Sequence, residues 1–257
     1  MKSEMVSIGG IELELHEAGS GTPLLLLHSA QGFNPAHSYV GLLAKRRRVI
    51  APSHPGFGKS SLPDWLDAVD DIAHLYLELM DRLDLGRVDL LGSSIGGWIA
   101  AEIATKVPDR VKHLVLAAPI GVKFGTPDRL EFPDIYAMPQ ERVMKLLYHD
   151  PENAKIDYAA LSDEEITTVA RNRETTALLT WEPFMHNPKL KHRLHRLTMP
   201  TLLLRGASDG FVSAAHIESY AKRLAQARVT TIAAAGHAIH VEQPQAFADT
   251  ILSFLDP

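Results

Sequence analysis

The chain of 257 residues has 46% hydrophobic and 22% charged residues, which is typical of a folded globular protein and not of a disordered chain or a coiled coil. Its formal net charge of -5 leaves it without the basic surface that nucleic-acid binding usually requires. Because the sequence contains no cysteine, disulfide frameworks, thiolate metal sites and a cysteine nucleophile are excluded.

Nothing in the sequence predicts a membrane span or a secretion signal. The longest apolar runs, such as Leu24–Leu27, are far shorter than the roughly 18 residues that cross a bilayer. The N-terminus carries Glu4, Glu12 and Glu14 and lacks the apolar core of a signal peptide. We therefore expect a soluble, cytoplasmic protein with neither a membrane nor a nucleic-acid partner; its oligomeric state stays open.

Strand and helix patterns alternate through most of the chain. A hairpin is predicted first, with arms Met5–Ile8 and Ile11–Leu15 joined by a Gly-Gly pair suited to a two-residue turn. Six short runs then predict strands at Leu24–Leu27, Val49–Ala51, Val88–Leu91, Leu114–Ala117, Thr201–Leu204 and Val229–Ile232, and the first is continuous and apolar, as a buried strand would be. Helical periodicity predicts helices near 68–83, 94–106, 213–226 and 244–255. The alternation predicts an α/β fold, a mostly parallel eight-stranded sheet with helices on both faces.

One stretch, residues 121–195, interrupts this alternation. It has no convincing buried strand, and it contains several prolines, aromatic residues and helical patterns at Glu141–Tyr148 and Asp163–Thr180. We interpret it as a helical lid inserted into a core formed by residues 1–120 and 196–257. Ordinary helices packed on the edge of the sheet are the alternative interpretation.

The strongest chemical signal is the run Gly-Ser-Ser-Ile-Gly at residues 92–96, where a predicted strand meets a predicted helix. Gly-x-Ser-x-Gly in this context is a nucleophile elbow, a turn so tight that only small residues fit two positions before and after the nucleophile. Ser94 has glycine at both positions, whereas Ser93 has leucine and isoleucine there. The pattern therefore predicts Ser94 as the nucleophile.

A serine hydroxyl needs an adjacent base, and the base needs an orienting group. Among 13 histidines, His237 follows the last predicted strand, and Asp209 follows the strand before it. Both loops lie at the carboxyl end of a parallel sheet, where the elbow also lies and where open α/β sheets bind ligands. His240 competes with His237, and Asp209 is also compatible with an Asx turn before Gly210.

The chain order Ser94, Asp209, His237 resembles that of the α/β-hydrolase superfamily. Three segments strengthen the resemblance. Residues 27–32 resemble the His-Gly-rich loop after the third strand, residues 54–60 the Pro-Gly turn after the fourth, and residues 236–244 the catalytic-histidine loop. The resemblance covers about residues 5–118 and 196–256 and implies a serine hydrolase with a helical lid. It selects His237 over His240.

The sequence departs from the superfamily pattern at two positions. Ser29 stands where glycine commonly follows the first histidine, and it either adds a hydroxyl to the pocket or fills space. Ser53 stands two residues before the proline of the Pro-Gly turn, where an acidic residue is usual. The second departure removes a structural anchor and is expected to leave the chemistry intact.

The resemblance implies acyl transfer without a cofactor or a metal. Ser94 attacks a carbonyl carbon, His237 takes the proton, and Asp209 orients the imidazole. The backbone N–H groups of Ala30 and Ile95 are expected to bind the oxyanion. Superfamily members that are dehalogenases or epoxide hydrolases use an aspartate at the elbow, so Ser94 argues against both.

We expect the substrate to be a small or medium, mainly apolar carboxylic ester or lactone. Ser29, Trp181 and Phe184 are the candidate substrate-binding residues, although the two aromatic side chains fit a packing role equally well.

Two alternatives share the fold. Hydrolases that cleave a C–C bond in meta-cleavage products often place Trp directly after the catalytic histidine, where this chain has Ala238; Arg171 or Arg173 would supply the lid arginine that they use. A small-molecule receptor with slow turnover is equally compatible with the sequence.

Two further classes fit less well. The pairs His192/His195 and His237/His240 have a spacing that suits a metal on a helix, but the sequence indicates no third ligand. The glycine-rich run at residues 92–97 lacks the Gly-x-Gly-x-x-Gly spacing of a dinucleotide site.

Overall fold

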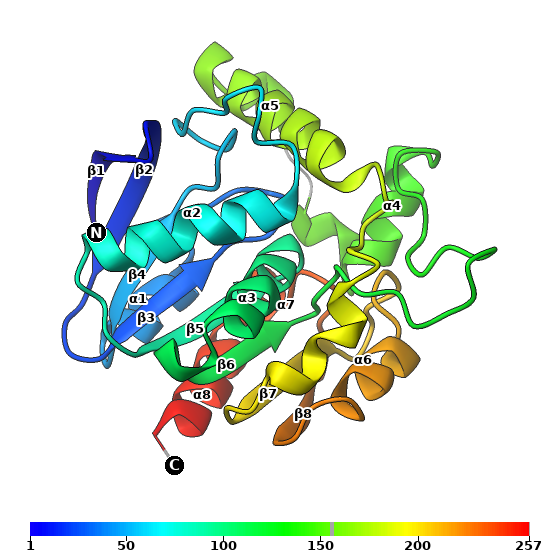
Figure 1. The fold of residues 1–257 in the computed structure, drawn as a ribbon. Coiled ribbons are helices and arrows are strands. Elements are labelled where there is room, and N and C mark those ends of the chain that lie inside the picture. Colours follow the sequence, from blue (N-terminus) through cyan, green and yellow to red (C-terminus); the bar gives the residue numbers. More distant parts are fainter. Residues whose placement is uncertain (155–156, 257) are drawn as a thin grey trace.

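Eight strands form one sheet in the computed structural model of the chain, which describes residues 1–154 and 157–256 (Figure 1). The strands are β1 (Lys2–Ile8), β2 (Ile11–Ala18), β3 (Pro23–Leu27), β4 (Arg48–Pro52), β5 (Val88–Ser93), β6 (Val111–Ala117), β7 (Thr201–Gly206) and β8 (Ala227–Ile232). Their order is β1-β2-β4-β3-β5-β6-β7-β8. The pairs β1–β2 and β2–β4 are antiparallel, and all the others are parallel. The predicted mostly parallel eight-stranded sheet is confirmed.

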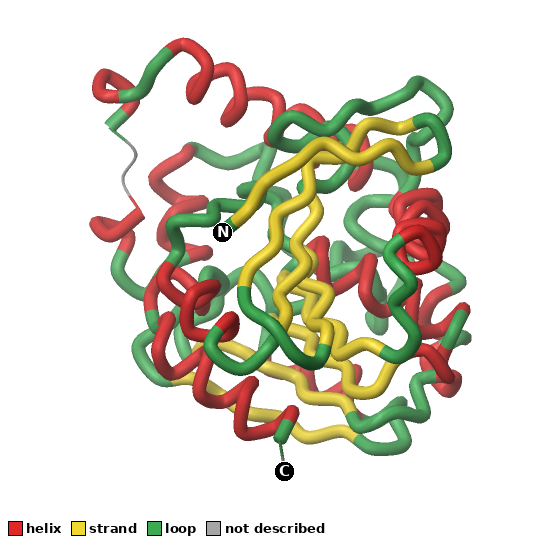
Figure 2. The backbone as a smooth tube through the Cα atoms, turned by 90° about the vertical axis from the view of Figure 1, so that its left-hand side faces the viewer, coloured by secondary structure: helices red, strands yellow, loops and turns green. Residues whose placement is uncertain are grey.

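Helices cover both faces of this sheet. On one face lie α2 (Val69–Arg82), α3 (Ile95–Lys106) and α6 (Ala214–Ala221), and on the other α1 (Ser38–Ala44) and α8 (Pro244–Leu255), which the short α7 (Ile239–Glu242) precedes. Figure 2 shows the strands between these two helical layers. Along β3, Leu25 and Leu27 belong to the first core, and Leu24 and Leu26 to the second. A continuous apolar run is what a strand buried on both faces requires.

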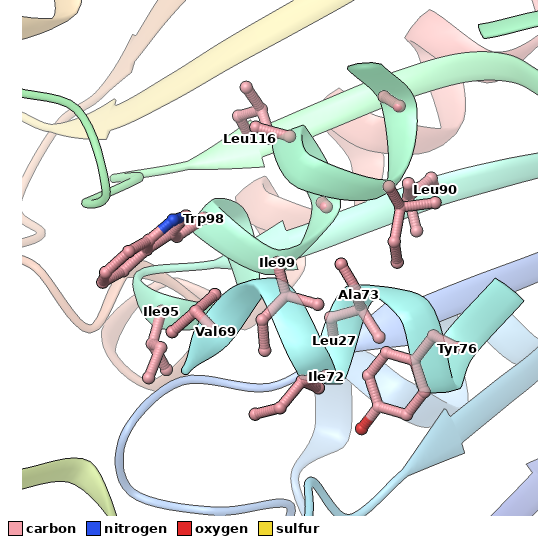
Figure 3. Close-up of a cluster of buried hydrophobic side chains, with 14 of the residues drawn as sticks. Leu27, Val69, Ile72, Ala73, Tyr76, Leu90, Ile95, Trp98, Ile99 and Leu116 are labelled. Carbon is pink, nitrogen blue, oxygen red and sulfur yellow. The ribbon is translucent and has the colours of Figure 1, made fainter. Parts of the chain in front are cut away.

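The core on the α2–α3 face is the larger of the two. Figure 3 shows part of it, where side chains of α2, α3 and the strands beneath interdigitate. Tyr76, Ile99 and Leu90 are fully buried there. This packing fixes α3, and with it the turn that precedes this helix.

Short elements account for most differences from the sequence prediction. Helices α1 and α7 are not predicted from the sequence, because with 7 and 4 residues they are too short to show a helical period. Helix α6 ends at Ala221 rather than near 226, because the chain turns there to enter β8 at Ala227.

The positive run at residues 45–48, whose shortness suggests a solvated helix end, is only partly solvated. Arg47 is 4% exposed, and its guanidinium pairs with the buried Asp89 and with Asp256 next to the C-terminus. Lys45 and Arg46 are exposed at the end of α1, whereas the pairing of Arg47 ties β5 to the end of α8.

Between β6 and β7 the chain forms α4 (Gln140–Leu147), α5 (Asp163–Thr180) and short 3-10 turns at Pro151–Ala154, Tyr158–Ala160, Leu190–His192 and Leu194–Arg196. Another such turn, Pro108–Arg110, precedes β6. Helices α4 and α5 lie beyond the carboxyl ends of the parallel strands (Figures 1 and 2). Within the described residues, no helix is both long and apolar enough to cross a bilayer.

Candidate active site

Ser94 occupies the sharp turn between β5 and α3. Its backbone has a φ of 55° and a ψ of -115°, a strained conformation for a residue with a side chain. A Cβ on Gly92 would lie 2.1 Å from the carbonyl oxygen of Gly96, and a Cβ on Gly96 would lie 2.2 Å from that of Leu27. Only glycine therefore fits two positions before and two positions after Ser94, as the sequence pattern predicts.

Three side chains from three loops meet in a hydrogen-bonded row. His237 Nε2 lies 2.9 Å from Ser94 Oγ, and His237 Nδ1 lies 3.1 Å from Asp209 Oδ2. A carboxylate oxygen accepts, so Nδ1 carries the proton and Nε2 is free to accept the serine proton. The side chains of Asp209 and His237 are 0% and 10% exposed, so the row lies largely out of solvent.

Asp209 has both of the roles that the sequence left open. Its Oδ1 accepts from the backbone N–H groups of Phe211 and Val212 at 2.9 and 2.8 Å, as in an Asx turn. Its Oδ2 accepts from His237. The turn therefore fixes the carboxylate in the orientation that the imidazole requires.

His240 lies apart from this row. Its ring packs edge-on against Tyr39 and near Phe247, under α8, and the residue is 8% exposed. Burial lowers the pKa of His240 to about 3, so the imidazole is neutral at neutral pH. The structure thus brings His237, and not His240, to Ser94.

The end of α4 holds the loops that carry the acid and the histidine. The Leu147 carbonyl accepts from the backbone N–H groups of His237 at 2.7 Å and Ala238 at 3.2 Å. The Leu146 carbonyl accepts from Gly210 N–H at 3.0 Å, next to Asp209. Carbonyls in the last turn of a helix have no partner within it, so they are available for these bonds.

The two predicted oxyanion donors are backbone N–H groups that make no hydrogen bond among the described residues. Ile95 is the first residue of α3, where an N–H has no acceptor within the helix. Ala30 lies in the loop after β3, and the carbonyl of the preceding peptide, on Ser29, accepts from His28 Nδ1 and Gly32 N–H.

The acidic anchor missing at Ser53 is supplied by another strand. Glu14 of β2 accepts from Ser53 Oγ at 2.9 Å and from Lys59 N–H at 3.2 Å, and thus holds the Pro-Gly turn. This role of Glu14 was not predicted, because the acidic residues of this arm alternate with apolar ones and fit a solvated face. Ser53 was the one indication in the sequence that another residue must supply the acceptor, because a serine there leaves the turn without its usual carboxylate.

A cavity of about 620 Å³ lies between α4, α5 and the loop that carries Ala30. Apolar side chains of α4 and Val241 form much of its wall. Arg173 of α5 is the only charged side chain among its described lining residues, because burial lowers the pKa of His37 and leaves that imidazole neutral at neutral pH. The complete lining is Ala30, Gln31, Gly32, Asn34, His37, Ile135, Tyr136, Gln140, Val143, Met144, Leu147, Tyr148, Tyr158, Val169, Asn172, Arg173, Thr176 and Val241.

None of the three predicted substrate contacts lines this cavity. Trp181 is 59% exposed at the end of α5, with its ring near Tyr136. Phe184 packs against the core, and Ser29 is a largely buried residue whose hydroxyl makes no hydrogen bond among the described residues. Among the cavity residues of α4 and α5, only Arg173 was named from the sequence, as a candidate lid arginine. The others were missed because nothing in a helical pattern tells which face meets a pocket.

The two histidine pairs do not converge on a common point. His237 is engaged by Ser94 and Asp209, whereas His195 Nδ1 hydrogen-bonds to the backbone carbonyl of His192. In the part of the chain that the structure describes, no group of three or more His, Asp or Glu side chains is placed to hold a metal ion.

A mostly parallel sheet with a Ser–His–Asp row at the carboxyl ends of its strands defines the class of α/β hydrolases. The sequence profile of the Alpha/beta hydrolase family matches residues 24–250. The chain belongs to this family and is a hydrolase of the α/β-hydrolase fold.

Proteins similar to this chain carry the names of different hydrolases. A 2-hydroxymuconate semialdehyde hydrolase of Pseudomonas sp. strain CF600 is 27% identical over 96% of this chain and 91% of that protein. A 2-hydroxy-6-oxo-2,4-heptadienoate hydrolase of Pseudomonas putida is 40% identical, but over only 49% of this chain and 48% of that protein. The solved structure of an esterase from Thermogutta terrifontis has a TM-score of 0.73 and 25% identity, over 100% of this chain and 98% of that one.

Proposed function

We propose that the protein is a serine hydrolase that cleaves a carboxylic ester or lactone through an acyl-enzyme on Ser94. The observation that carries the proposal is the row in which Asp209, His237 and Ser94 are linked by hydrogen bonds of 3.1 and 2.9 Å. A neutral imidazole with a fixed tautomer, next to a serine at a strained turn, is the arrangement that activates a hydroxyl for attack.

The chemical steps follow from this row. Ser94 Oγ adds to the carbonyl carbon while its proton passes to His237 Nε2. The N–H groups of Ile95 and Ala30 are the proposed donors to the oxyanion, and the loss of one such donor typically costs about 100- to 1,000-fold in rate. His237 then protonates the leaving alcohol, and the same imidazole activates the water that releases the acid.

We also propose that residues 121–195 act as a cap over a core of residues 1–120 and 196–257. The cavity under α4 and α5 supports this division, because it is bounded by the cap on one side and by the Ala30 loop on the other. Its volume of about 620 Å³ suits a small or medium organic substrate. A small molecule is therefore the proposed partner.

C–C bond hydrolysis of a meta-cleavage product is the second candidate function. The names of the two Pseudomonas relatives favour it, and so does Arg173, which lines the cavity and would attract a substrate carboxylate. Arg171 does not suit this role, since its guanidinium donates to the carbonyls of Gly58 and Ser60. Ala238, in place of the usual tryptophan, weighs against this candidate.

Labelling with a fluorophosphonate tests the proposed nucleophile. The expected result is one adduct by intact mass, in which a bond from Ser94 Oγ to phosphorus replaces the bond from phosphorus to fluorine. Ser94→Ala should take up no label, whereas the matched variant Ser93→Ala should be labelled like the wild type. Label on neither, or equal label on both variants, would overturn the assignment of Ser94.

A substrate panel then separates the candidate functions. Nitrophenyl esters and lactones of increasing length are compared with a 2-hydroxy-6-oxo-dienoate, and Arg173→Ala is run beside the wild type. The ester proposal expects turnover of the neutral esters that Arg173→Ala leaves unchanged. Turnover confined to the dienoate and lost in Arg173→Ala would favour the C–C hydrolase, and tight ligand binding with negligible turnover would favour a receptor.

A further inference from the structure

Two buried histidines lie one above the other beneath the loop that carries Ala30. The rings of His28 and His54 are stacked with their centroids 3.6 Å apart and an interplanar angle of 27°. His28 is 3% exposed and His54 is fully buried. His28 follows β3 and His54 follows β4, so the pair joins two neighbouring strand ends. Neither ring belongs to the Ser–His–Asp row.

Hydrogen bonds occupy all four ring nitrogens of this pair. His28 Nδ1 donates to the Ser29 carbonyl at 2.7 Å, and His28 Nε2 accepts from the backbone N–H of His54 at 2.9 Å. His54 Nε2 donates to the His28 carbonyl at 3.0 Å. His54 Nδ1 is then without a proton, and it accepts from the Tyr76 hydroxyl at 2.6 Å. Carbonyls only accept, so this pattern allows a single tautomer for each ring.

Tyr76 brings the only hydroxyl group in this chain of contacts. It lies on α2 among fully buried apolar side chains (Figure 3). The surroundings offer the hydroxyl few alternatives, and an unpaired hydroxyl in an apolar core is costly. The Tyr76 hydroxyl therefore directs the proton of His54 onto Nε2, where it holds the His28 carbonyl.

The chain of contacts ends at the proposed oxyanion donor. In a trans peptide the N–H points opposite to the carbonyl. Because His28 Nδ1 and Gly32 N–H fix the Ser29 carbonyl, they also fix the direction of the Ala30 N–H. The His28 carbonyl lies against the elbow, 2.5 Å from the position of a Cβ on Gly96. The stacked pair thus fixes both the loop and its distance from the nucleophile turn.

We propose that His54, oriented by the Tyr76 hydroxyl, is a positioning residue that holds the Ala30 N–H at the oxyanion of the reaction catalysed by Ser94. The proposal rests on the proposed function, since it gives this N–H a role only in acyl transfer. Neither His54 nor Tyr76 touches the reacting atoms; both act through His28.

The ionisation state of the pair is consistent with this role. Burial lowers the pKa of His28 to about 4, and burial together with the neighbouring His28 lowers the pKa of His54 well below its ordinary value. Both rings are therefore neutral in neutral solution, as the donor and acceptor pattern requires.

Tyr76→Phe tests the proposal, because it removes one oxygen atom and keeps the ring that α2 buries. Tyr220→Phe is the matched control: Tyr220 is also fully buried, and its hydroxyl has no hydrogen-bond partner among the described residues. With a nitrophenyl ester, Tyr76→Phe is expected to lower kcat by about tenfold or more, less than the roughly 100- to 1,000-fold loss on deleting an oxyanion donor. Its KM should stay close to that of the wild type, and Tyr220→Phe should match the wild type in both.

A second readout separates positioning from general loss of structure. Phenylboronic acid forms a tetrahedral adduct with Ser94 Oγ and places an oxygen at the oxyanion position. Its inhibition constant should rise in Tyr76→Phe by the same factor by which kcat/KM falls. Rates are expressed per active site titrated with the fluorophosphonate, so an unfolded fraction does not lower them. Wild-type kcat and boronate affinity in Tyr76→Phe would overturn the proposal.

Two substitutions of His54 separate its contact with the His28 carbonyl from its contact with the Tyr76 hydroxyl. His54→Gln keeps an amide N–H that reaches the His28 carbonyl, whereas His54→Asn keeps only an acceptor for Tyr76. The glutamine variant should retain more activity, and adding Tyr76→Phe to it should cost nothing further. If asparagine serves as well as glutamine, the His28 contact is not what matters and the proposal is wrong. Wild-type protein that neither labels nor turns over any ester refutes the proposed function itself, before the variants are compared.

Discussion

At the scale of single residues, the candidate site depends on two choices: which of two adjacent serines lies at the elbow, and which of two nearby histidines contacts it. Ser94 and Ser93 are adjacent, and only the first has glycine two positions to either side, where a Cβ would meet backbone at 2.1 and 2.2 Å. That choice was predictable from the sequence, because steric limits at the turn are local. The choice between His237 and His240 was not local: both lie in one loop, and only the resemblance of residues 236–244 to the catalytic-histidine loop of the superfamily selected His237.

The two histidines give a prediction with an internal control. His237→Ala removes the imidazole that contacts Ser94 and should lower kcat by roughly 1,000-fold or more, as losses of triad members do. His240→Ala removes an imidazole packed against Tyr39 and should keep kcat within about tenfold of the wild type, at some cost in stability. Ester hydrolysis per folded protein, with folding followed by circular dichroism, measures both. Equal losses in the two variants would contradict His237 as the base.

At the scale of elements, helices are positioned by contacts that their own sequence does not display. A buried polar stripe on α5 reaches two loops of the core: Asn172 donates to the Gln31 carbonyl and accepts from Gly58 N–H, and Thr175 donates to the Gly56 carbonyl. The pattern of α5 predicted a helix at Asp163–Thr180, with the observed bounds. It could not predict these partners, because they are backbone atoms more than 100 residues away.

Asn172→Ala tests whether this stripe matters. The substitution leaves two partly buried backbone groups without their side-chain partner, at a cost of at most about 1–3 kcal/mol each, because solvent reaches part of this site. We expect a clear drop in the free energy of unfolding and a lower kcat, since the Gln31 loop also carries Ala30. Thr167→Ala, on the exposed side of the same helix, should change the free energy by no more than about 0.5 kcal/mol. Urea unfolding curves of both variants are the measurement.

Two helical glycines offer a second comparison. A Cβ on Gly96 would overlap the backbone of Leu27, whereas a Cβ on Gly41, in α1, has nothing within 4 Å. Gly41→Ala should therefore stabilise the protein by about 0.5–1 kcal/mol through the helix propensity of alanine. Gly96→Ala should lower the melting temperature sharply and abolish labelling of Ser94. A Gly96→Ala variant as stable as the wild type would contradict the tight elbow.

At the scale of the whole molecule, short apolar runs sufficed to predict the central strands of the sheet, because a strand buried on both faces is apolar along most of its length. What the sequence could not provide was pairing across the chain. The carboxylate that holds the Pro-Gly turn comes from Glu14, 39 residues before Ser53. Likewise, the cavity forms only where α4 and α5 approach the Ala30 loop. Both depend on tertiary contacts that no local pattern encodes.

The buried histidines predict how global stability responds to acid. The pKa of His28 is lowered to about 4 and that of His240 to about 3, from an ordinary value of 6.5. Below pH 6.5 the unfolded chain protonates these imidazoles while the folded protein does not, so the free energy of unfolding falls as pH drops toward 4. Above pH 6.5 they add no slope. Urea midpoints from about pH 7.5 to 5 should decline below about 6.5.

A single substitution checks the origin of that decline. His240→Phe keeps a ring between Tyr39 and Phe247 and removes one titrating group. Its midpoint should therefore depend less steeply on pH than that of the wild type. Hydrogen bonds from His216 and the Gly125 N–H lower the pKa of Glu131 to about 2 in spite of its partial burial. Glu131 therefore titrates below the pH range of this experiment and does not contribute to the slope. An unchanged slope would mean that other groups cause the decline.

The bonds from the end of α4 to the histidine and acid loops limit how the cap can be exchanged. Protein engineers often treat such a region as a cassette, to be swapped between homologues to alter selectivity. Here the carbonyls of Leu146 and Leu147 support the backbone at Gly210, His237 and Ala238, so the proposed cap and the loops that carry Asp209 and His237 are parts of one assembly. A chimera that replaces the whole of residues 121–195 therefore replaces these hydrogen-bond acceptors as well as the walls of the cavity. Grafts that leave the last turn of α4 in place should preserve turnover while selectivity is altered.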